Sequence, residues 1–277
     1  MRALKTIFDF YINSSIHVAL AIVAMACITY LEFDVATDSN LLYFMGFASI
    51  TGYNFVKYFG LAKFHHRSLS SKLKAIQIFS LFCFLAMCFF ALKLNPASLI
   101  AISVFGVVTF LYAIPLLPNR FFVDKKKKLR SISGLKIYII ALVWSGVTVI
   151  LPLINSDYEL YDDVLISAAQ RFIIVIILML PFEIRDLNYD SLKLSTIPQQ
   201  IGVKQTKLAG LVLTLVVVFL EYFKDDINLS HLQSLVVIST VMLMFIKFST
   251  QQQGRYYSAF WVESLPIFWL VLFLVLS

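Results

Sequence analysis

The sequence has few charged residues: Asp, Glu, Lys and Arg together make up only 14% of its 277 residues. Soluble domains usually contain about a quarter of such residues. With 60% apolar residues, the chain lacks the polar surface that an ordinary soluble domain needs. The same composition excludes a disordered or collagen-like chain. The three cysteines lie in apolar runs and form no Cys-x-x-Cys pair, which argues against a disulfide scaffold or a zinc site.

Long apolar runs dominate the chain instead, and its mean hydropathy is +0.85. A helix needs roughly 20 apolar residues to cross a hydrocarbon core of about 30 Å. The runs do not alternate in polarity as barrel strands do, so they predict helices. We therefore expect an all-α integral membrane protein, with residues 1–277 forming a single polytopic domain. The expected helices cover approximately 14–31, 41–60, 75–93, 97–116, 137–153, 164–182, 207–222, 231–247 and 258–276.

Basic residues are concentrated in alternate loops, which predicts the direction of the chain in the membrane. Of the 23 Lys and Arg residues, only Lys93 and Lys224 lie in the opposite loops, and Arg171 lies inside an expected helix. Because basic loops stay in the cytoplasm, we expect a cytoplasmic N-terminus and a C-terminus on the other side of a bacterial inner membrane. The same rule explains the net charge of +7 without a nucleic-acid partner. The tract Lys125–Lys128 is more typical of an anchor to anionic lipid headgroups than of a ligand site.

An acidic stretch follows the sixth expected helix. Glu183, Asp186 and Asp190 have the spacing i, i+3 and i+7, which places three carboxylates on one helix face if the sixth helix continues through them. A divalent cation would relieve their repulsion, and Mg²⁺ typically binds one or two carboxylates plus substrate phosphates. We expect these three residues to hold Mg²⁺. A solvated helix end, with Arg185 as the ion-pair partner, explains the same spacing.

The residues after this stretch carry a family resemblance. A Thr-Ile-Pro step at 196–198 and Gly202 follow Asp186 and Asp190. Together they resemble the second aspartate-rich motif of the UbiA superfamily of intramembrane prenyltransferases, which lies after the sixth of nine helices. The resemblance implies nine helices around a central cavity. It also implies that Asp186 and Asp190 are catalytic, binding the Mg²⁺ used to transfer a prenyl group from a polyprenyl diphosphate to a lipophilic acceptor.

The resemblance also suggests residues that bind the substrate. The stretch 111–115 looks like the Tyr-x-x-Pro step of the family, so Tyr112 would orient the substrate together with Asn54. Arg130 and Lys136 resemble basic residues that meet the diphosphate in the family. A leaving diphosphate needs cations around it. Basic residues in such a loop are, however, more often explained by membrane topology alone.

The first aspartate-rich motif of the family is not present in this chain. Asn54 matches it, but Phe55, Tyr58 and Ala62 stand where the family has aspartates. One of two carboxylate clusters is therefore missing, which weakens the case for activation by two metals. We expect Lys57 to bind diphosphate directly in place of one metal.

Two charged residues are expected inside the membrane, Arg171 and Glu263. A charge at the centre of a membrane helix costs about 2.5–3.5 kcal/mol on insertion scales, so each marks a candidate site. The two residues could pair, although we favour Arg171 reaching toward the outer interface. Two other functions stay open: a non-catalytic protein that binds an isoprenoid lipid or scaffolds a complex, and a secondary transporter.

Overall fold

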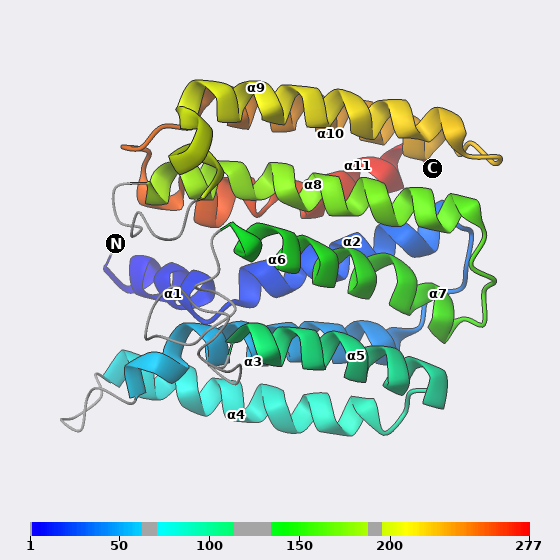
Figure 1. Cartoon of the computed structure of the whole chain (residues 1–277). Helices are drawn as coiled ribbons and strands as arrows, with labels where there is room; N and C mark the ends of the chain where they lie inside the picture. The colour runs from blue at the N-terminus through cyan, green and yellow to red at the C-terminus, as the bar shows by residue number, and fades with distance from the viewer. Residues whose placement is uncertain (1, 63–70, 114–133, 188–195) are drawn as a thin grey trace, which may run out of the picture.

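The computed structural model describes residues 2–62, 71–113, 134–187 and 196–277, and in these ranges it contains helices and no strand (Figure 1). The elements are α1 (Arg2–Asn13), α2 (Ile16–Glu32), α3 (Ser39–Ala62), α4 (Ser71–Ala91), α5 (Pro96–Ala113), α6 (Leu135–Ser145), the π-helical η3 (Gly146–Ile150), α7 (Leu151–Asn155), α8 (Asp162–Asp186), α9 (Ile197–Leu220), the short η5 (Glu221–Phe223), α10 (Leu229–Phe248), the π-helical η6 (Tyr257–Val262) and α11 (Leu265–Leu276).

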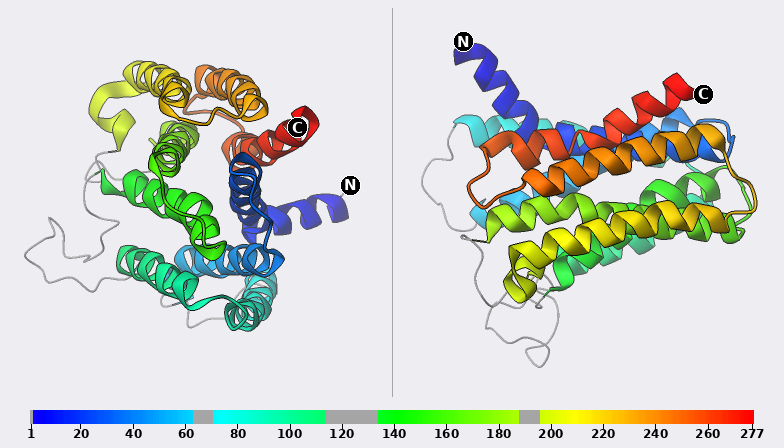
Figure 2. Two further views of the ribbon diagram at one scale, coloured as in Figure 1. Left: turned by 90° about the vertical axis from the view of Figure 1, so that its right-hand side faces the viewer. Right: turned by 90° about the horizontal axis from the view of Figure 1, so that it is seen from above.

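The long helices run side by side and close into a ring (Figure 2). Neighbours around the ring pack directly: α2 on α3, α3 on α4, α5 on α6, α6 on α8, α8 on α9, α9 on α10, and α10 on α11. The ring closes where α11 packs back on α2. Elements from the two ends of the chain therefore share one apolar core, which runs from Val18 in α2 to Phe273 in α11.

Six helical stretches of the described residues are long and apolar enough to cross a membrane, or seven if α1 and α2 count as one span bent by 57°. The expected count of nine is therefore not confirmed. In α5 the apolar stretch Pro96–Leu111 is shorter than a full span. α3 covers the expected run 41–60. The polar residues Asn54 and Lys57 lower the mean hydropathy of this helix.

The bundle has two ends, which we call the near end and the far end. At the near end, on the left of Figure 1, lie α1, the end of α8 and the start of α9. At the far end, on the right, lie the end of α2, the start of α8 and the end of α9. α8 joins the two ends through the core, with Asp162 and Asp163 in its first turn, where a helix dipole favours negative charge.

α9 begins well before the expected run 207–222, because its first turn has stabilising contacts of its own. The backbone N–H of Thr196 donates to the Gln199 side chain at 3.0 Å, and Pro198 sits in the first turn, where a missing N–H costs nothing. Gly202 then leaves the helical conformation with φ 78° and ψ 160°. A residue with a side chain rarely adopts such a φ, so this glycine permits the kink between the first turn and the main body of α9.

Gly146 allows a close approach between η3 and α5. A Cβ atom at this position would lie 2.1 Å from the Phe105 ring, whereas a Cβ at Gly106 on α5 would have nothing within 4 Å. We expect Gly146→Ala to destabilise the protein by about 1–3 kcal/mol through overpacking. Gly106→Ala should leave stability equal or slightly higher, since alanine favours a helix over glycine. Thermal unfolding of the two purified variants measures the difference, and equal midpoints would contradict the close packing.

Candidate functional site

The near end of α8 is tied to the start of α9 through a buried carboxylate. Glu183 is buried, and its Oε2 accepts the backbone N–H of Ile197 at 3.1 Å. That N–H belongs to the first turn of α9, where a helix leaves its backbone donors without partners. Glu183 thus supports the local fold at the position where the sequence predicts a metal-binding carboxylate.

Asp186 lies one turn further along α8 and pairs with its neighbour. Arg185 Nε donates to Asp186 Oδ1 at 2.7 Å, and Arg185 Nη2 donates to Oδ2 at 3.0 Å. Both side chains are about a quarter exposed, at 28% and 27%. This is the ion pair that the solvated helix end predicts. Asp190 lies outside the described residues, and within them no group of three His, Cys, Asp or Glu side chains could hold a metal.

The α3 positions that correspond to the degenerate first motif bind the break between α1 and α2. Asn54 is buried, donates to the Ser14 carbonyl at 2.9 Å and accepts from the Ser15 hydroxyl at 2.8 Å. Tyr58 donates its hydroxyl to the Asn13 carbonyl at 2.9 Å. Ser15 has a left-handed φ of 64°, so these contacts hold a strained turn between two helices. The sequence signal for this contact is the polar Asn13-Ser14-Ser15 step between two mainly apolar segments.

Lys57 connects this break to a second group of charges. Its Nζ donates to Ser15 Oγ at 2.8 Å, and its charge acts on Glu263, which lies between η6 and α11. Arg185 also acts electrostatically on Glu263. Glu263, in the segment between η6 and α11, is therefore within electrostatic reach of one cation from α3 and one from α8. Sequence reasoning had singled out Glu263 but not its partners.

The remaining predicted substrate residues are only partly described. Lys136 lies in the first turn of α6 at the near end and is half-buried. Tyr112 is in the last turn of α5, with its side chain outside the described set, and Arg130 lies outside the described residues altogether. Their proposed roles stay predictions.

Arg171 does not reach the interface, so our expectation of its position is wrong. It is fully buried in α8, donates to the Met25 carbonyl at 3.0 Å, and stacks its guanidinium 4.9 Å from the centre of the Trp269 ring. The pairing with Glu263 is not observed either, because the carboxylate that acts on Arg171 is Glu32. A backbone carbonyl and an aromatic face thus satisfy this charge inside the bundle.

Comparison with known proteins finds no similar sequence: no family model matches the chain, and no curated protein does. Solved structures match its fold over nearly the whole length. A digeranylgeranylglyceryl phosphate synthase is 15% identical, with a TM-score of 0.58 over 99% of this chain and 98% of the other. A UbiA homolog from Archaeoglobus fulgidus, bound to GPP and Mg²⁺, is 12% identical, with a TM-score of 0.58 over 96% of this chain and 98% of the other.

The same homolog bound to DMAPP and Mg²⁺ is also 12% identical, with a TM-score of 0.50 over 96% of this chain and 95% of the other. At such low identity the likeness concerns the fold alone. The chain is therefore an all-α integral membrane protein with the fold of the UbiA superfamily, as the motif around Asp186 suggested.

The Asn54 contacts give a prediction about stability. Asn54→Leu removes a buried amide that serves Ser14, Ser15 and Ser80, and it leaves their polar atoms without this partner. We expect a loss of about 1–3 kcal/mol, because unsatisfied buried groups carry their full desolvation cost.

The matched control for Asn54→Leu is Tyr58→Phe. This change removes one half-buried hydrogen bond, and we expect it to cost about 1 kcal/mol or less. Thermal unfolding in detergent gives both values. If Asn54→Leu unfolds at the same temperature as the wild type, the side chain does not hold the α1–α2 break.

Proposed function

We propose that this protein is a prenyltransferase that moves a prenyl group from a polyprenyl diphosphate to a lipophilic acceptor, at the near end of the bundle. The observation that carries the proposal is the UbiA fold over almost the whole chain, with the second aspartate-rich motif at the junction of α8 and α9. Structural neighbours that were solved with GPP or DMAPP and Mg²⁺ support the class of donor.

In this proposal, Asp186, Asp190 and Glu183 hold Mg²⁺. The donor chemistry fits, because Mg²⁺ prefers carboxylate oxygens. Asp186 would have to exchange the Arg185 guanidinium for the metal. The pair is partly exposed, and exposed ion pairs are worth only about 0–1 kcal/mol, so the exchange costs little. Bound Mg²⁺ would neutralise charge that develops on the leaving diphosphate.

The basic residues of the chain would bind the diphosphate itself. Lys57 is fixed by Ser15 at the near end, Lys136 lies in the first turn of α6, and Arg130 comes from the connection between α5 and α6. Tyr112 would orient the substrate. Asn54 would act through its hold on Ser15, the residue that receives the Lys57 ammonium.

A second candidate function is a non-catalytic protein that binds an isoprenoid lipid. The first motif lacks its aspartates, and the described residues contain no group of three carboxylate, His or Cys ligands. This function predicts that a prenyl diphosphate binds and is recovered unchanged.

The two functions separate in an assay for release of diphosphate from labelled geranyl diphosphate, with purified protein, Mg²⁺ and a set of lipophilic acceptors. We expect turnover that EDTA abolishes. Asp186→Asn should lower kcat/KM by about 100-fold, as expected for loss of electrostatic stabilisation of the leaving group.

The matched control for Asp186→Asn is Asp162→Asn, which changes an exposed residue at the other end of the same helix and should keep wild-type turnover. Equal turnover in Asp186→Asn would contradict the metal assignment. Binding without turnover in the wild type would favour the second function.

Lys57 allows a separate test of diphosphate binding. We expect Lys57→Met to raise KM for the prenyl diphosphate about tenfold or more with a smaller change in kcat. A cation that binds the diphosphate equally strongly in the ground state and in the transition state contributes mainly to substrate binding. Lys57→Arg should restore most of the affinity. Lys93→Met, which removes a cation at the far end, is the control, and an equal effect of both Met variants would argue against a local contact.

A further inference from the structure

The helix α1 has an apolar face that the described part of the chain covers only in part. Its apolar side chains recur at Leu4, Ile7, Phe8 and Tyr11, which is the spacing of a helix with one apolar face. Leu4 is 78% exposed and Ile7 is 70% exposed, whereas Phe8 and Tyr11 are half-buried. The proposed reaction uses neither of the two exposed side chains.

The second half of α1 packs between two other elements of the bundle. The centre of the Phe8 ring lies 5.1 Å from that of Phe260 in η6, and the centre of the Phe10 ring lies 5.7 Å from that of Phe79 in α4. The apolar face of α1 therefore begins inside the bundle. It continues to Leu4 and Ile7, where the described side chains no longer cover it.

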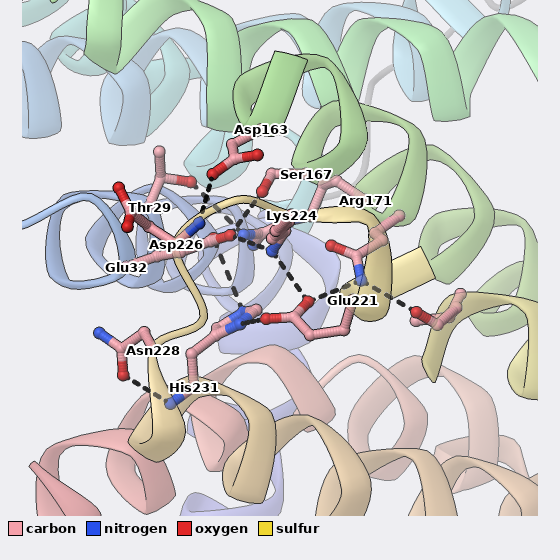
Figure 3. Close-up of polar contacts among 12 residues, drawn as sticks. Thr29, Glu32, Asp163, Ser167, Arg171, Glu221, Lys224, Asp226, Asn228 and His231 are labelled. Carbon is pink, nitrogen blue, oxygen red and sulfur yellow. Dashed lines mark hydrogen bonds and ion pairs between the residues drawn. The ribbon is translucent and has the colours of Figure 1, made fainter. Parts of the chain in front are cut away.

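The direction of α1 follows from α2, which the bundle holds at both ends. At the far end, Glu32 of α2 accepts a hydrogen bond from Lys224 at 2.7 Å (Figure 3). At the near end, α1 leaves α2 at a bend of 57°, and Asn54 binds the backbone at the break. Figure 2 shows that α1 consequently projects sideways beyond the ring.

The surfaces on either side of α1 belong to helices that are candidate membrane spans. Few residues of α4 are buried, and Ile78 and Phe82, close to Phe79 in this helix, are exposed. Trp261, which follows Phe260 in η6, is exposed as well. Exposed apolar surface of this extent marks a contact with a membrane or another protein, and in a membrane span it faces lipid. The apolar face of α1 therefore continues a surface that lipid covers.

The two ends of the bundle expose charges of opposite sign. At the near end, the exposed charged side chains that the structure describes are basic, and at the far end most of them are acidic. The basic side chains include Lys5, Lys74, Lys204, Lys247 and Arg255, and the acidic ones include Asp34, Asp157, Glu159, Asp162 and Asp225. Basic residues beside a membrane are attracted to anionic lipid headgroups, so the near end suits an anionic surface.

The polar face of α1 has the same sign of charge. Lys5 is exposed on this face. Asp9 lies one turn further along and is 3.4 Å from Arg255 Nη2, so a cation of the bundle already offsets its charge. Lys5 therefore leaves a positive charge beside the exposed apolar side chains. An apolar face next to a basic polar face is typical of a helix that lies at a bilayer surface.

We propose that α1 is an interfacial helix, which inserts Leu4 and Ile7 among the acyl chains beside the ring and presents Lys5 to anionic phospholipid headgroups. The bend after Asn13 turns α1 out of the bundle, and the near-end charges match the headgroups. The proposal concerns the attachment of the chain to lipid and does not rest on the prenyl-transfer reaction.

The first test measures how deep α1 lies in a bilayer. In the full chain, with its three cysteines replaced by alanine, Ile7→Cys receives a nitroxide label. Single copies are placed in nanodiscs of mixed phosphatidylcholine and phosphatidylglycerol. Relaxation of the label by oxygen, which concentrates among acyl chains, and by a water-soluble nickel chelate gives its depth. We expect the label to lie about 5–10 Å below the headgroup boundary, the depth typical of interfacial helices.

The matched control is Thr6→Cys, an exposed neighbour on the polar face of α1. A label at this position should be relaxed mainly by the nickel chelate. Both positions are exposed, so neither label disturbs the packing of the bundle. A label at position 7 that is as accessible to the chelate as the label at position 6 would overturn the proposal. A second copy of the chain or another protein would then be the partner of this face.

The second test concerns the charge of Lys5. In the mixed nanodiscs, Lys5→Gln should shift the equilibrium between inserted and free α1 about fivefold toward the free state, the effect of one basic residue at an anionic surface. Access of the chelate to the label at position 7 measures this shift. Lys93→Gln, which removes an exposed cation at the far end, should leave the access unchanged. Equal access in Lys5→Gln and in the chain that retains Lys5 would overturn the assignment to anionic headgroups.

Discussion

A polar group inside a membrane-spanning bundle cannot form a hydrogen bond with water, so its partner must come from the protein. The two ends of this ring of helices follow from that constraint. At the near end, the amide of Asn54 satisfies the backbone where α1 and α2 meet at Ser14 and Ser15. At the far end, Lys224 lies between two carboxylates from different helices. Between the two ends lies an apolar core to which α2, α8 and α11 all contribute.

Sequence reasoning predicted the all-α membrane fold because hydropathy is a local property, and the motif around Asp186 led to the fold that solved structures share. It failed where the outcome depends on residues distant in the chain. The guanidinium of Arg171 binds the Met25 carbonyl and the Trp269 ring, and the residues next to Arg171 in the sequence predict neither contact. The expected count of nine spans is not confirmed, and apolar runs alone do not reveal a bend such as that between α1 and α2.

At the candidate site, the α3 positions that resemble a metal-binding motif have a structural role instead. Where the family places aspartates after Asn54, this chain has side chains that build structure, and the Tyr58 hydroxyl reaches the Asn13 carbonyl. Lys57 brings a positive charge to the same place. The sequence indicated the missing carboxylates, but only the fold revealed what the replacing residues contact. Any chemistry at this end has to work beside a helix junction that the same residues maintain.

The kink at Gly202 divides α9 into two parts with different attachments. The first turn is bonded to α8 through Glu183 and Ile197, whereas the main body packs along α8 and α10. The segment before the kink thus belongs to α9 in the sequence but is hydrogen-bonded to α8. The left-handed conformation of this glycine lets the start of α9 bond to the end of α8 near Asp186, while the rest of α9 keeps its packing along the bundle.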